Sequence, residues 1–206
     1  MRLTDLKKAL TERGLEVTAG LHPQEGGTVY LIGPSERFWP DFKATPEYAD
    51  ETPDPMDRYS KRLLIPLAAD FEAEAVFPSD GPPWPPFVAW ALASGSVHSS
   101  PVGLLVSARD GLWVSFRGAL RFSDRLDLPA PEPAPCVTCT SQPCRNACPV
   151  QAFCGKSYDA DACRADLHSL TNDCLARGCA VRRACPASAL RRRNDEQSAF
   201  HMAAFV

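Results

Sequence analysis

All nine cysteines of this 206-residue chain lie between Cys136 and Cys185. The sequence from Met1 to Gly14 alternates charges with leucines and lacks the apolar run of a signal peptide, so we expect a cytoplasmic protein. In that reducing compartment, clustered cysteines act as metal or redox ligands before they act as disulfides. The longest weakly charged run, Val76 to Ala108, contains six prolines, so we expect no membrane span. A set of metal ligands therefore constrains the fold of the last third of the chain.

The first four cysteines follow the spacing C-x2-C-x4-C-x3-C-P, from Cys136 to Cys148-Pro149. This run resembles that of bacterial ferredoxins, C-x2-C-x2-C-x3-C-P, in which three thiolates hold one [4Fe–4S] cluster and the fourth reaches a neighbouring cluster. Loops this short close around one cluster at a small entropic cost. Cys185 is again followed by proline, so the resemblance implies two clusters, on the order of 10 Å apart.

The interleaved ferredoxin pattern implies two sets of four ligands. The first set, which we call site I, is Cys136, Cys139, Cys144 and Cys185. The second set, site II, is Cys148, Cys163, Cys174 and Cys179. Cys154 is left over, and we expect it to be a free thiol. Two spacings depart from the ferredoxin pattern, since four residues separate Cys139 from Cys144 and the last motif is C-x4-C-x5-C-P.

Two alternatives for the cysteines stay open at this point. Structural zinc sites also take four thiolates, although they usually draw on paired C-x2-C knuckles and only Cys136 and Cys139 form one. Disulfides in an exported chain are the other alternative, against which stand the odd number of cysteines and the missing signal.

The charge of the chain changes sign where the cysteines begin. Residues 1–135 carry 13 basic and 19 acidic side chains, whereas residues 136–193 carry nine and four. Arginines beside a cluster offset its negative charge and raise its potential, or help a partner to dock. We therefore expect a redox partner protein and no nucleic acid.

The segment 128–135 has four prolines in eight residues and reads as a semi-rigid linker between a domain at 1–127 and a ferredoxin-like domain at 136–206. Helix and strand signals mix in the first domain, which predicts an α+β layer domain. The expected helices cover 4–14, 54–74, with Pro66 kinking or splitting it, and 87–93. The expected strands cover 15–18, 28–32 and 74–77, and a hairpin of 103–107 with 112–117.

The segment from Gly103 to Leu120, with its Asp-Gly-Leu-Trp-Val-Ser-Phe-Arg-Gly-Ala-Leu end, precedes the cysteine motifs. In this order the two resemble epoxyqueuosine reductases and reductive dehalogenases, and the segment alone is similar to cobalamin-processing decyanases. The resemblance implies a nitroreductase-like α+β domain that holds a corrinoid or flavin and receives electrons from the ferredoxin-like domain.

Two residues of the first domain are candidates, Asp80 from this resemblance and Arg117 from its position in the sequence. Asp80 lies at about the distance before the hairpin where the reductases keep a catalytic acid, and its alternative role is to start a proline-rich turn. Arg117, expected inside a strand, needs a carboxylate or a bound anion as a partner and is our candidate cofactor contact. We expect one-electron transfer by two [4Fe–4S] clusters, with a corrinoid- or flavin-dependent reductase and a structural zinc-binding interaction protein as alternatives.

Overall fold

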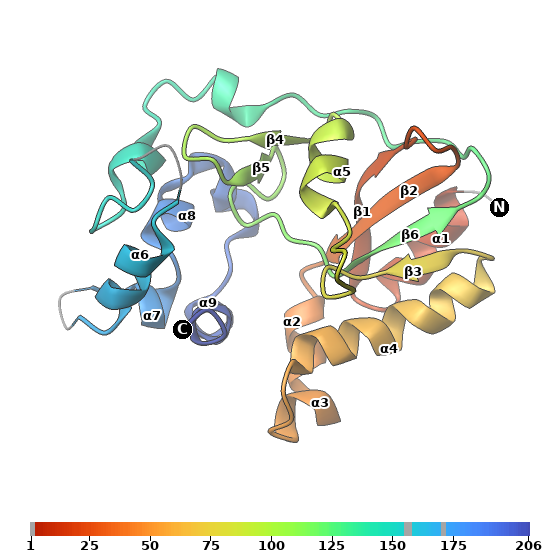
Figure 1. The fold of residues 1–206 in the computed structure, drawn as a ribbon, viewed down its shortest axis with the longest axis horizontal. Helices are drawn as coiled ribbons and strands as arrows, with labels where there is room; N and C mark the ends of the chain where they lie inside the picture. Colours follow the sequence, from red (N-terminus) through yellow and green to blue (C-terminus); the bar gives the residue numbers. More distant parts are fainter. Residues whose placement is uncertain (1–2, 155–157, 170–171) are drawn as a thin grey trace. The chain divides into compact units, whose positions relative to one another are not determined.

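The computed structural model, which describes residues 3–154, 158–169 and 172–206, divides the chain into two units (Figure 1). Unit 1 comprises Met1–Ser96 and Ser115–Pro131, and unit 2 comprises Val97–Val114 and Glu132–Val206. The last division falls inside the predicted linker. The segment Val97–Val114 belongs to the same unit as the cysteines, which differs from the predicted domain at 1–127. Helices and strands mix as expected for the α+β class.

Unit 1 contains a four-stranded antiparallel sheet in the order β1-β2-β6-β3. Its strands are β1 (Leu15–Leu21), β2 (Thr28–Pro34), β6 (Gly118–Phe122) and β3 (Glu74–Val76). Tyr30 of β2 pairs with Leu120 of β6. Six consecutive residues of β2 are buried, and since neighbouring side chains of a strand point to opposite faces, both faces of this strand are covered.

The other regular elements of unit 1 are helices. They are α1 (Leu3–Thr11), α2 (Phe38–Lys43), α3 (Pro46–Ala49), α4 (Pro55–Asp70) and α5 (Phe87–Ala93). The expected helices at 4–14 and 87–93 are confirmed, and α4 packs along β3 and β6 (Figure 1). Pro66 was expected to kink or split the helix at 54–74; α4 runs unbroken through it, because Pro66 is exposed and the hydrogen bond that it cannot donate is lost on the solvent side of the helix.

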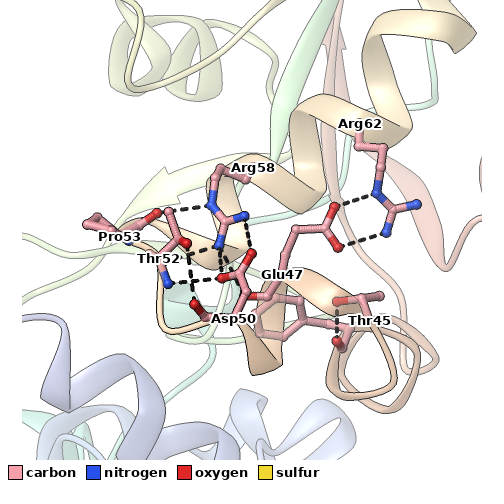
Figure 2. A network of polar contacts seen from close by, with 8 residues as sticks. Thr45, Glu47, Asp50, Thr52, Pro53, Arg58 and Arg62 are labelled. Atoms are coloured by element: carbon pink, nitrogen blue, oxygen red, sulfur yellow. Dashed lines mark hydrogen bonds and ion pairs between the residues drawn. The ribbon is translucent and has the colours of Figure 1, made fainter.

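A polar network fixes the chain before α4 to the side of that helix (Figure 2). The Glu47 carboxylate accepts two hydrogen bonds from Arg62, of which the one from Nη2 is 3.0 Å long. This pairing lowers the pKa of Glu47 to about 2. Arg58 donates to the Asp50 carboxylate and to backbone carbonyls, so it lowers the pKa of Asp50 to about 2 as well. These contacts hold α3 and the residue after it against α4.

In unit 2, β4 (Val97–Ser99) and β5 (Leu105–Ser107) form an antiparallel pair. The predicted pairing of 103–107 with 112–117 is wrong, since β5 meets that side only in a bridge between Ser107 and Gly111 and β6 begins at 118. Residues 112–114 are buried, and Leu112 belongs to an apolar cluster with the thiols of Cys144 and Cys185. Packing in unit 2, and not strand pairing, therefore explains this apolar run.

The remaining elements of unit 2 are short helices, of which all but the last two carry or separate cysteines, and the last two follow Cys185. They are η1 (Pro135–Val137), η2 (Pro143–Asn146), α6 (Ala160–Leu167), α7 (Cys174–Arg177), α8 (Ala180–Ala184), η3 (Pro186–Arg191) and α9 (Asp195–Ala203). Side-chain oxygens of Asp159 and Asn194 cap α6 and α9. No helix in the described ranges has the length and apolar character of a membrane span.

Candidate metal centres

The four thiols of site I line one cavity of about 410 Å³. Cys136 comes from η1, Cys144 from η2 and Cys185 from the residue between α8 and η3. Burial raises the pKa of the Cys136 thiol, and the neighbouring thiols of Cys185, Cys144 and Cys139 raise it further. Four thiols from separate elements are thus within electrostatic reach of one another.

The four thiols of site II line a second cavity, which is much smaller at about 20 Å³. Apolar side chains close it, among them Leu167, Val181 and Met202. Burial raises the pKa of Tyr158, and the neighbouring Cys163 thiol raises it further. The Tyr158 ring stacks on Phe153, with ring centres 4.6 Å apart. The cavity at site II is therefore small and closed by apolar side chains, whereas the cavity at site I is about twentyfold larger.

Two short helices run from one site to the other. Cys179 of site II precedes α8 and Cys185 of site I follows it, and at 1.5 Å per residue these six steps span about 9 Å. In the same way η2 leads from Cys144 to just before Cys148, and α8 contacts η2. Val181 of α8 is fully buried, lines the cavity of site II and packs with thiols of site I.

The arginines near the thiols are engaged inside unit 2. The Asp173 carboxylate accepts 3.1 Å hydrogen bonds from both Arg177 and Arg183. Arg182, whose pKa burial lowers, donates to the backbone carbonyl of Leu112. Arg193 lies over the Trp113 ring at 5.4 Å. These contacts hold α7, α8 and the segment after β5 together beside the thiols.

Each site offers a set of four thiols around a cavity, which is a donor set that both iron–sulfur clusters and zinc ions take. A [4Fe–4S] cluster takes one thiolate on each of its four irons. A single zinc ion with bonds of 2.3 Å needs its four sulfurs about 3.8 Å apart. Within the described ranges, no three His, Cys, Asp or Glu side chains gather in the way that one metal ion requires. Ser100 also lines the site I cavity, and its hydroxyl is buried without a hydrogen-bond partner among the described residues.

Cys154, the ninth cysteine, is exposed and lines neither cavity. Its backbone amide donates to the carbonyl of Gln151 at 3.0 Å. The structure thus places Cys154 apart from both sets of four thiols, in the position expected of a free thiol.

Asp80 lies in unit 1 with both carboxylate oxygens engaged. One accepts from Lys61 at 3.1 Å, and the other accepts from the backbone amide of Phe77 at 2.8 Å. The Asp80 amide in turn donates to the Phe77 carbonyl, which closes the turn. These contacts match the structural role in a proline-rich turn, and catalysis by Asp80 stays a prediction.

Arg117 lies just before β6, and the expectation that it sits inside a strand is wrong. Its backbone amide donates to the carbonyl of Ile32 in β2 at 2.7 Å, so Arg117 lies beside the sheet one residue before β6 begins. Its Nε atom is buried and has no partner within the described part of the chain, and burial lowers the pKa of its guanidinium. A contact to a cofactor stays a prediction for Arg117.

The sequence matches no protein-family model and no curated protein. Three contributors to the sites lie outside the cysteine spacing and were missed: Ser100 and Leu112 at site I, and Tyr158 at site II. The sequence holds no signal for Ser100. Leu112 stands in an apolar run that was assigned to a strand, and Tyr158 is a lone aromatic residue five positions before Cys163.

Proposed function

We propose that the protein carries two [4Fe–4S] clusters, one at site I and one at site II, and transfers single electrons between protein partners. The observation that carries this proposal is the grouping of eight thiols around two cavities, four at each. When bound, such clusters supply a one-electron couple. The ferredoxin-like spacing of the cysteines supports the same function.

The arrangement of α8 and η2 supports transfer through the chain. About 9 Å separate Cys179 from Cys185 at the two ends of α8, and the buried Val181 side chain excludes water between the sites. One electron enters from a reduced donor protein, which is oxidised by one electron, and it leaves to an acceptor protein, which is reduced by one. The residues hold the two sites at a fixed spacing and tune them through burial and nearby arginines.

The experiment is an anaerobic purification with iron, acid-labile sulfide and zinc counted per chain, together with the visible spectrum. We expect about eight iron and eight sulfide, with a broad absorbance that dithionite bleaches. Cys139→Ser should lower iron to about four per chain, whereas the matched variant Cys154→Ser should keep about eight. A colourless protein that holds stoichiometric zinc would contradict the proposal and favour a structural zinc-binding interaction protein.

A second candidate function is a corrinoid- or flavin-dependent reductase that receives electrons from its own clusters. The Arg117 Nε atom, which is buried and has no hydrogen-bond partner in the described ranges, favours it because a bound anion could accept that hydrogen bond. Under this candidate, unit 1 is a nitroreductase-like domain. Anaerobic reconstitution with flavin or corrinoid, followed by gel filtration, tests it: retained cofactor absorbance that Arg117→Met abolishes supports the reductase, and no retained cofactor refutes it. A cytoplasmic location fits both candidates, since each needs reduced thiols.

A further inference from the structure

Helix α9 forms part of the wall of site II although it carries no cysteine. Its residue Met202 lines the site II cavity. Every other described segment that lines this cavity also supplies one of the four thiols, as α6 supplies Cys163 and α7 supplies Cys174. Among the described residues, α9 is therefore the part of the wall that can move away without displacing a metal ligand.

The helix packs on the chain between two of these ligands (Figure 1). Gly178 separates α7 from Cys179, and a Cβ added to it would lie 2.8 Å from the Cβ of Ser198 in α9. Arg177 donates a 3.2 Å hydrogen bond to the carboxylate of Asp195, the first residue of α9. These contacts place α9 against the residues that position the thiol of Cys179.

The residues after α9 contact a second side of site II. The guanidinium of Arg164, the residue after Cys163, lies 4.8 Å from the centre of the Phe205 ring, and its Nε atom donates to the Phe205 carbonyl at 3.4 Å. The ring centres of Phe205 and Tyr158 are 6.4 Å apart, and Tyr158 in turn stacks on Phe153, which lines the cavity. The segment 195–205 therefore closes site II from the sides of both α7 and α6.

The contacts that hold α9 are weak ones. Of its nine residues, all of which the structure describes, Ser198 alone is buried. The ion pair between Arg177 and Asp195 is half exposed, so it contributes little to stability. A helix of nine residues is not stable by itself in water. Elements with few buried contacts open locally more often than the whole fold unfolds, and α9 belongs to this class.

We propose that the segment 195–205 is a lid that controls the passage of metal into and out of site II. When the lid is docked, it shields the metal at site II from water, chelators and oxidants, and when it opens, the metal exchanges. Site I differs, because Thr138, Thr140 and Ser141 on the wall of its cavity are exposed. The inference rests on the proposed function only in that the thiols hold a metal, and it applies to zinc as well as to iron.

The test is a timed alkylation of the purified, metal-loaded protein with N-ethylmaleimide under anaerobic conditions. Phenanthroline, which chelates both ferrous iron and zinc, is present to take up released metal. Peptide mass spectrometry gives the labelling rate of each cysteine, since a thiolate becomes free to react only after its metal has left. The exposed thiol of Cys154 is the internal reference for the reagent. We expect the thiols of site II to react at least about tenfold more slowly than those of site I.

Three alanine variants separate the lid from a general effect on the fold. Met202→Ala removes the side chain that lines site II but keeps the helix, because alanine is the best helix former. Phe205→Ala removes the ring that contacts Arg164 and Tyr158. Both should speed the labelling of site II by about tenfold and leave site I unchanged. Val206→Ala, which shortens the exposed neighbouring side chain, is the matched control and should keep the wild-type rates.

Equal labelling rates at the two sites of the wild type would overturn the lid, and so would wild-type rates in both Met202→Ala and Phe205→Ala. If Met202→Ala speeds both sites, Phe205→Ala decides, because Phe205 lines neither cavity. Faster labelling of site II alone then supports the lid, and any other result refutes it. The metal content of the same samples tests the proposed function separately: stoichiometric zinc would refute the clusters and leave the lid standing.

Discussion

Replacing Gly111 with alanine tests the packing of the β4–β5 segment on the chain after Cys185. Gly111 has a φ of 56°, and an added Cβ would lie 2.3 Å from the backbone nitrogen of Ser188 and 2.6 Å from its Cα. The left-handed conformation costs an alanine about 1–2 kcal/mol. Relief of the overlap costs about 1–3 kcal/mol, and loss of the hydrogen bond from Leu112 to Ser188 costs about 1 kcal/mol more. We expect Gly111→Ala to destabilise unit 2 by about 3–6 kcal/mol.

Gly103→Ala is the matched control, because Gly103 has a φ of 76° in the same segment but open space around an added Cβ. It should show only the conformational cost. The difference between the variants, about 2 kcal/mol or more, corresponds to about thirtyfold faster amide exchange. Hydrogen–deuterium exchange with mass spectrometry of peptides over 97–114 and 180–190 measures it without reference to any bound group. Equal protection in the two variants would refute the packing argument.

Three further predictions concern unit 1. Glu47→Gln should lower the free energy of unfolding by about 1–3 kcal/mol at pH 7. Because the pKa of Glu47 is about 2 in the folded protein, the Glu47 carboxylate contributes its full stabilisation above the ordinary pKa of 4.5 and loses it as the pH falls toward 2. Urea unfolding titrations across that pH range measure this loss. Asp80→Asn should cost less than about 1 kcal/mol, since the ion pair with Lys61 is half exposed and an amide oxygen still accepts from Phe77; a larger loss in urea unfolding contradicts this. Arg117→Met should raise the melting temperature of the ligand-free protein, because it removes a charged group whose buried Nε atom has no hydrogen-bond partner in the described ranges; a lower melting temperature would mean that the rest of the guanidinium is stabilised, for example by Asp57.

The grouping of the cysteines could be predicted because it is mostly local. Loops of two to four residues bring Cys136, Cys139 and Cys144 to one place in any ferredoxin-like fold, and the spacing alone suggests that Cys148 points elsewhere. The assignment of Cys185 to the first set needed the resemblance to two-cluster ferredoxins. The structure has Cys185 on the wall of the site I cavity.

The error at 112–117 has a physical cause. The turn signal at 108–111 was sound, since Ser107 and Asp110 close that turn with their side chains. An apolar run after a turn predicts a paired strand only if its side chains are buried by the sheet. Here Leu112 is buried by the thiols of Cys144 and Cys185 and by Val181, which lie more than 30 residues later in the sequence and leave no local signal.

The proline-rich segment marks a change in composition, but it does not divide the protein into two parts that are each complete. The chain leaves unit 1 after Ser96, returns to it at Ser115, and leaves it again after Pro131. A fragment that began at the linker would contain all nine cysteines, yet it would lack Ser100 and Leu112 from the wall of site I. It would also lack the Leu112 backbone groups with which Ser188 and Arg182 form hydrogen bonds. Site I is therefore built from two separate stretches of sequence, and only one of them is visible in the cysteine spacing.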